Sequence, residues 1–213
     1  MLGMIVTALV TGAIAAMLSA VAQGWTQSNA AGNSSNRVMM THLRIQNVLR
    51  GVKQLGACRP GTLEGTEAAC VLIWKADTNL DYKVQFSELA MLELTPSDGK
   101  LRYYEVNYPS SWNSGQVTAA DTPALASDDI YRDDVDADPP DSAIEDFRDA
   151  EYVTATVLAE GISGGEFHKY DGYTTARPRF EYLLNFTTGS TTETEYGSVA
   201  VRTPATLPSS KWQ

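Results

Sequence analysis

The N-terminal segment constrains this chain most, because residues 1–27 carry no charged side chain and the first charge is Arg37. Residues 1–22 are all apolar, small or hydroxyl-bearing. A helix rises about 1.5 Å per residue, so this stretch would reach roughly 33 Å, enough to cross a hydrocarbon core of ~30 Å. We therefore predict that residues 1–24 form the transmembrane half of a helix and place the chain in a membrane by a single pass.

A signal peptide is the alternative interpretation of the same segment. Ala20-Val21-Ala22 has the small-x-small pattern of a cleavage site. A signal peptide usually has a shorter apolar region, roughly 7–15 residues, behind a basic stretch, and nothing basic precedes this one. Cleavage would leave a secreted or periplasmic binding module that begins at Gln23.

Residues 25–56 indicate an amphipathic second half of the same helix. Apolar residues recur there at helical spacing, and basic side chains fall between them. We predict one long helix from Met1 to about Leu55, weakened near Gly32 and ended by Gly56. The recurring apolar residues are Val38, Ile45, Val48, Leu49, Val52 and Leu55.

Small residues form a further pattern in the apolar half, with Gly12, Ala16 and Ala20 spaced four apart. Small side chains let helix backbones approach each other closely. This pattern predicts a stripe that packs against other helices. Glycine and alanine are also common in apolar helices with no such role, and this interpretation stays open.

The remainder, residues 57–213, reads mainly as strands of one globular domain. Apolar runs at 83–94 and 100–108 flank the turn sequence TPSDG, and alternating runs at 177–189 and 191–204 flank Gly189-Ser190. Such hairpins are antiparallel, so we predict an α+β fold in which the long helix packs on antiparallel β-hairpins.

Charge is distributed unevenly along the chain. The first 60 residues carry about +5 and the rest about −15 of a net charge of −10. An acidic body of this kind is a poor partner for nucleic acid. Acidic residues are dense near the end of residues 108–141, which we predict to be a solvated loop, and Ser142 and Glu145 then suit the start of a helix that turns Ile144 and Phe147 inward.

Cys58 and Cys70 are the only cysteines, and they flank a loop that contains proline and glycine. Two cysteines around a short loop predict a disulfide in an oxidising compartment. The alternative is a pair of buried thiols.

The segment DTNLDYKVQFSEL raises the possibility of a calcium site. Asp77, Asn79, Asp81 and Glu88 fall at positions 1, 3, 5 and 12 of an EF-hand-type loop. Tyr82 occupies the position where the sharp turn needs glycine, so a true EF-hand is not predicted. Two interpretations remain, a nonstandard calcium loop and a hairpin that binds no cation.

No residue pattern indicates catalysis, and we predict that the chain is not an enzyme. The two histidines, His42 and His168, have no nucleophile in a recognisable motif nearby. A membrane-anchored hydrolase is therefore the least favoured function.

The N-terminal segment MLGMIVTALVTGAIAAMLSAVAQGW resembles the core of a class III prepilin segment, just after the motif Gly-Phe-Thr-Leu-Val-Glu. The segments VLAEGISGGEFHKYD, RFEYLLNFTTG and YGSVAVRTP are similar to the C-terminal strands of J-type minor pseudopilins of type II secretion systems and of the related W-type minor pilins.

The resemblance implies a pilin-like fold and a structural role in a pseudopilus or pilus-like fibre. It further implies an inner-membrane anchor, a periplasmic domain and partner pseudopilins that are bound through the N-terminal helix. The prepilin leader and the family's glutamate are missing before Met1, so we expect Met1 to correspond to the sixth residue of the mature protein.

Overall fold

The computed structural model describes residues 16–21, 23–24, 35–63, 67–76, 84–121, 141–170, 179–188 and 191–201. It divides the chain into two compact units, Met1–Met40 and Thr41–Gln213. In the first unit the described residues, 16–21, 23–24 and 35–40, are helical. The second unit holds all the strands described below.

The second unit begins with the end of a helix described over residues 35–49. Thr41, Ile45 and Leu49 lie four residues apart and are at most 1% exposed. The burial of Ile45 and Leu49 confirms this part of the predicted amphipathic stripe. The helix ends earlier than predicted, however, because strand β1 begins at Gln54 and its backbone pairs with β2.

The predicted fold class, a pilin-like fold built on a long N-terminal helix, is wrong for the described residues. Among the first 55 residues, helix is described only at 16–21, 23–24 and 35–49. Antiparallel sheets with short helices make up most of the later described residues. The physical reason in the second unit is the repeated alternation of β-branched and aromatic residues, which favours strands. Residues 1–15, 22 and 25–34 lie outside the described part.

The predicted inner-membrane location is also contradicted. Within the described ranges, no helix combines the length and the apolar content that crossing a bilayer requires.

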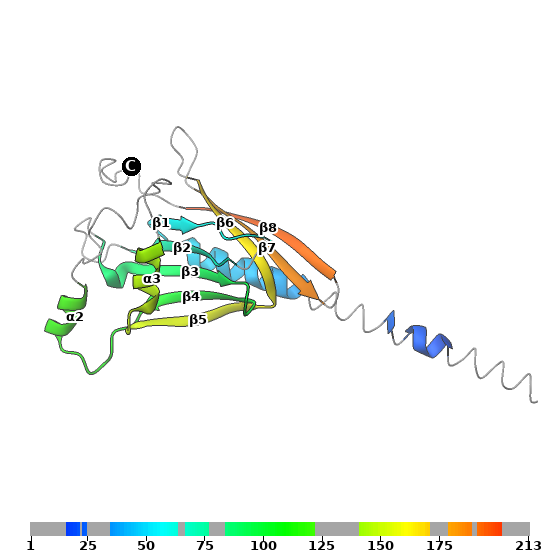
Figure 1. Ribbon diagram of the computed structural model, residues 1–213, viewed down its shortest axis with the longest axis horizontal. Helices are drawn as coiled ribbons and strands as arrows, with labels where there is room; N and C mark the ends of the chain where they lie inside the picture. The colour runs from blue at the N-terminus through cyan, green and yellow to red at the C-terminus, as the bar shows by residue number, and fades with distance from the viewer. Residues whose placement is uncertain are drawn as a thin grey trace, which may run out of the picture. The chain divides into compact units, whose positions relative to one another are not determined.

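The larger sheet, sheet A, has five antiparallel strands in the order β1-β2-β3-β4-β5 (Figure 1). The predicted hairpin of β3 and β4 is confirmed, and Gly99 supplies a left-handed residue in its turn with φ 66°. Strand β5 pairs with β4, although it comes much later in the sequence. The strands are β1 (Gln54–Arg59), β2 (Ala69–Trp74), β3 (Leu89–Thr95), β4 (Lys100–Val106) and β5 (Val153–Glu160).

The smaller sheet, sheet B, has three antiparallel strands in the order β6-β7-β8. The predicted pairing of the last two strands is confirmed. Gly197 lies opposite Tyr182, whose ring occupies the space that a Cβ atom at Gly197 would need. The strands are β6 (Ile162–Tyr170), β7 (Arg179–Thr188) and β8 (Thr191–Ala200).

Short helices accompany sheet A. Helix α3 (Asp141–Asp149) buries Ile144 and Phe147, as predicted, in a cluster with η1 (Phe86–Glu88) and the strand residues Cys70, Leu72, Leu89 and Met91. Helix α2 (Ser114–Asp121) lies where a loop was predicted. The side chain and backbone of Asn113 exchange hydrogen bonds with those of Gln116, a capping box that favours helix there.

Candidate functional site

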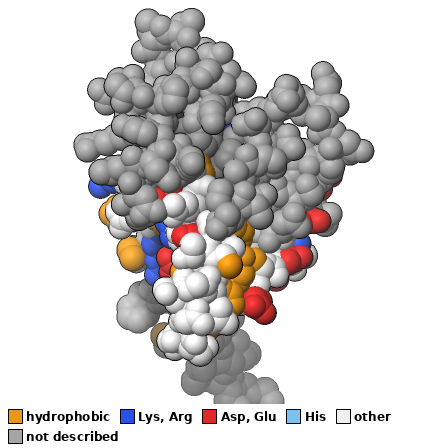
Figure 2. Space-filling model, turned by 90° about the vertical axis from the view of Figure 1, so that its left-hand side faces the viewer, with side chains coloured by type: hydrophobic (Ala, Val, Ile, Leu, Met, Phe, Trp, Pro, Cys, Tyr) orange, Lys and Arg blue, Asp and Glu red, His pale blue; other side chains and the backbone are white. Residues whose placement is uncertain are grey.

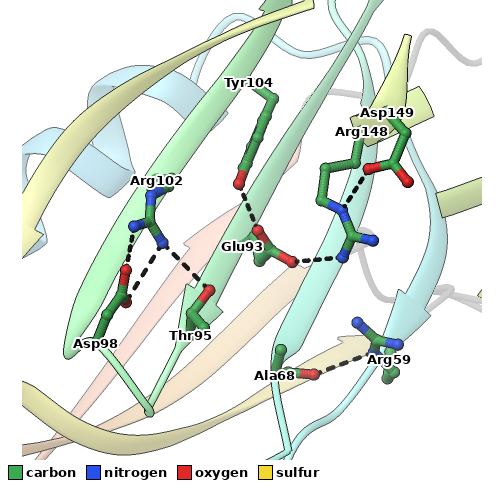
Figure 3. A network of polar contacts seen from close by, with 9 residues as sticks. All are labelled: Arg59, Ala68, Glu93, Thr95, Asp98, Arg102, Tyr104, Arg148 and Asp149. Atoms are coloured by element: carbon green, nitrogen blue, oxygen red, sulfur yellow. Dashed lines mark hydrogen bonds and ion pairs between the residues drawn. The ribbon is translucent and has the colours of Figure 1, made fainter. Parts of the chain in front are cut away.

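A buried carboxylate is the centre of the main polar network on sheet A (Figure 3). Glu93 on β3 is 3% exposed. The hydroxyl of Tyr104 on β4 donates to Glu93 Oε2 at 2.6 Å, and Arg148 Nη1 of α3 lies 3.5 Å from Oε1. Burial, followed by the hydrogen bond to Glu93, raises the pKa of Tyr104. The network therefore compensates a buried charge and joins α3 to the sheet.

The flanks of this network are also paired (Figure 3). Arg148 Nε donates to Asp149 at 3.0 Å, and Arg102 forms an ion pair with Asp98 in the β3–β4 turn. The hydrogen bond from Arg102 lowers the pKa of Asp98. These carboxylates are engaged in holding the fold together, which is a structural use of charge.

A second polar centre anchors helix α2 through Asp121. Its Oδ1 accepts from the Ser87 backbone N–H at 2.7 Å and from the Tyr108 hydroxyl at 3.0 Å, and its Oδ2 accepts from Ser87 Oγ at 3.0 Å. The described side chains of α2 include none that is buried. The contacts of Asp121 therefore carry much of the attachment of α2 to the body.

Aromatic rings gather beside this anchor. Tyr108 stacks on Trp112 with centroids 5.7 Å apart, and both rings lie within 6 Å of Tyr152. All three are half-buried and continue into Phe86 and Phe147 of the core. Figure 2 faces this end of the molecule, and hydrophobic, acidic and basic side chains are interspersed over its described surface.

The predicted calcium ligands are only partly described. Asp77, Asn79 and Asp81 lie outside the described residues. Glu88 is 2% exposed, and its Oε2 accepts from Trp74 Nε1 at 3.1 Å and from the Gln85 backbone N–H at 3.3 Å. The described residues include no group of acidic, histidine or cysteine side chains that could hold a metal ion. Calcium binding stays a prediction.

The predicted disulfide is not formed. Cys58 lies opposite Val71, and Cys70 lies opposite Arg59. Directly paired residues share a face and successive residues alternate, so the two sulfur atoms point to opposite faces of sheet A. Cys70 is buried in the cluster with α3, whereas the Cys58 thiol donates to the Phe167 carbonyl oxygen of β6 at 3.7 Å. A disulfide would require a change of strand register.

The described part of the predicted helix stripe is exposed. Ala16 and Ala20 are exposed in the first unit, and Gly12 lies outside the described residues. Large apolar side chains of the same segment are exposed as well, with Met17 73%, Leu18 65% and Val21 59% accessible.

The two histidines lie in different surroundings. His42 Nδ1 is 2.8 Å from the Tyr182 hydroxyl, and His168 Nε2 is 3.3 Å from Glu166 Oε2.

The predictions that the chain has no catalytic residues and does not bind nucleic acid stay predictions. Glu93 is not among the predicted site residues, although an acidic residue inside the apolar run LAMLEL is itself a signal of a buried, paired charge.

No protein-family model, curated protein or solved structure matches the chain.

Proposed function

We propose that this chain is a structural subunit of a fibre, a minor pseudopilin of a type II secretion pseudopilus or of a related type IV pilus-like fibre. The observation that carries the proposal is the exposure of Met17, Leu18 and Val21 in a helical segment without charged residues. Burying one such side chain contributes about 1.5–3 kcal/mol, so these residues favour association.

The composition of this segment supports a helix of another subunit as the occupant. Ala16 and Ala20 lie four residues apart in the same segment, so a second helix backbone can approach them closely. The larger side chains beside them would then fill the space around the contact. The sequence resemblance to J-type pseudopilins supports the same partner class.

Cysteine cross-linking tests this proposal. The full chain with Leu18→Cys, in a Cys58→Ser background, would be co-expressed with pilin-like proteins from its gene neighbourhood that carry a cysteine in their own N-terminal helix. We expect an oxidised heterodimer with at least one of them. Thr192→Cys, an exposed position on β8, is the matched control and should give no such product.

Two results would contradict the proposal. One is equal cross-linking at positions 18 and 192. The other is the absence of a cross-link at position 18 with every pilin-like protein of the gene neighbourhood, or a neighbourhood that encodes no pilin-like protein and no secretion ATPase.

A further inference from the structure

Strand β5 forms an open edge of sheet A (Figure 1). No residue from Val153 to Ala159 is charged, and none is proline. Residues 154–157 are all exposed, although successive side chains point to opposite faces, so this part of the strand is uncovered on both faces. An uncharged, exposed edge of this kind presents its backbone for pairing with another strand.

The phase of the β4–β5 ladder shows which backbone groups face outward. The Asn107 N–H donates to the Tyr152 carbonyl oxygen at 2.7 Å, and Val106 pairs with Val153 next along the ladder. Hydrogen-bonded and non-hydrogen-bonded pairs alternate along an antiparallel ladder, so the backbone N–H and carbonyl groups of Thr154 and Thr156 bond to β4. The backbone groups of Ala155 and Val157 therefore face outward, and so does the carbonyl of Val153. The N–H of Val153 is already used, because it donates to the Ala150 carbonyl oxygen.

The other three sheet edges are covered or charged. On β1, the Gly56 carbonyl accepts from Lys169 Nζ of β6. On β6, the Phe167 N–H donates to the Pro60 carbonyl at 2.8 Å. Strand β8 carries Glu193 and Glu195. Charge and cover are the usual protections of a sheet edge, and β5 has neither between Val153 and Val157.

The exposed stretch is also a palindrome, Val153-Thr154-Ala155-Thr156-Val157. We propose that β5 pairs antiparallel with β5 of a second copy of this chain, about a two-fold axis at Ala155. The pairing sets Val153 against Val157 of the partner subunit and Thr154 against Thr156 of the partner subunit. Ala155 then meets its own symmetry mate, and the two sheets become continuous.

The backbone phase and the side chains agree with this register. The backbone groups that hydrogen-bond across the axis are the outward-facing ones. The N–H groups of Ala155 and Val157 donate, and the carbonyl oxygens of Ala155 and Val153 accept. Val153, Ala155 and Val157 share one face of the sheet, so cross-strand apolar pairs lie together, and threonine pairs occupy the other face. A closed two-fold contact of this kind limits assembly to a dimer.

The two ends of the stretch limit the pairing to this register. Leu158 is the extra residue of a bulge between β4 and β5, and its carbonyl accepts from Arg44. Glu151 and Glu160 lie just outside the palindrome. A bulge and charged residues end edge pairing, so shifted registers lose contacts on one side. This dimer is independent of the proposed fibre function, because it uses neither unit 1 nor a pilin-like partner.

Sedimentation equilibrium of the full chain across micromolar to millimolar concentrations tests the dimer. Ala155→Pro removes an outward N–H and leaves the ladder to β4 intact, so the dimer dissociation constant should rise at least tenfold with little change in the melting temperature. Ala155→Ser keeps the N–H and the small size, and should dimerise like the wild type.

Cysteine cross-linking gives the second measurement. Opposed residues of such a pair lie about 5.5 Å apart at Cα, within the range of roughly 4.4–6.8 Å that suits a disulfide. Ala155→Cys in a Cys58→Ser background should therefore form a disulfide-linked dimer on oxidation, and Thr192→Cys should not. A wild-type chain that stays monomeric throughout, or a dimer unaffected by Ala155→Pro and not cross-linked at 155, would overturn the proposal. If the wild-type chain stays monomeric, the strand that pairs with this edge would have to come from a different protein.

Discussion

The hydroxyl of Tyr104 donates a hydrogen bond of 2.6 Å to the buried carboxylate of Glu93, across neighbouring strands of sheet A. Glu93 also faces Arg148 of α3, so one carboxylate links two strands and a helix. This link makes the stability of α3 depend on a residue of β4.

Tyr104→Phe should therefore destabilise the fold. The substitution leaves a buried carboxylate with one donor fewer, at a cost of about 1–3 kcal/mol. Urea unfolding measures the change in the free energy of unfolding. Tyr103→Phe, on the opposite face of the same strand, is the matched control and should cost less. Equal losses in the two variants would show that the Glu93 contact has no special weight.

The stability of the fold should fall between about pH 9 and pH 11 through Cys70. Burial raises the pKa of this thiol from 9.0 to about 11. The unfolded chain loses this proton at lower pH than the folded chain, so the contribution is complete below pH 9 and is lost as the pH rises through about 11. The loss is on the order of 2–3 kcal/mol.

The Cys70→Ala variant isolates this effect from the tyrosines. It should show a smaller fall in the free energy of unfolding over the same pH window, measured by denaturant titration at each pH. If the two proteins lose stability in parallel, the thiol does not titrate as inferred.

Gly197→Ala should destabilise sheet B. The new methyl group would overlap the buried ring of Tyr182, whose hydroxyl contacts His42. Overpacking of this kind costs about 1–3 kcal/mol. Thermal unfolding measures it, with Gly51→Ala as the control, since no atom beyond its chain neighbours lies within 4 Å of a Cβ there. A melting temperature equal to that of the Gly51→Ala variant would contradict the close packing.

Asp121→Ala should loosen helix α2 without unfolding the domain. The substitution removes acceptors for Ser87 and Tyr108, and α2 has no buried side chain among those described to hold it instead. Hydrogen exchange should accelerate at least tenfold in residues 114–121 and stay unchanged in β2 and β3. Exchange rates in α2 that match the wild type would show that the helix is held by other contacts.

Local patterns predicted several parts of the fold correctly. The spacing of Ile45 and Leu49 identified the buried stripe of a helix, and the pairs of strands joined by short turns identified the hairpins. Ile144 and Phe147 were recognised as inward-facing. Each of these signals depends on residues a few positions apart, and side-chain periodicity along a helix or strand is sufficient to detect it.

The predicted disulfide and the predicted long N-terminal helix were wrong. The disulfide was predicted from the closeness of Cys58 and Cys70 in sequence, but strand register sends their side chains to opposite faces. The length of the N-terminal helix was predicted from an apolar run followed by apolar residues at helical spacing, and the described residues do not bear it out.

The sequence by itself determined the alternation that makes the body a set of antiparallel strands, the uncharged palindrome at 153–157 and the apolar character of the N-terminal segment. Only the tertiary structure decided that β5 joins β4 as an outer strand, that Glu93 meets Tyr104 and Arg148, and which face each cysteine occupies. The physical reason is that local propensities act over a few residues. Register and the choice of neighbouring strand, in contrast, depend on burying side chains that are far apart along the chain.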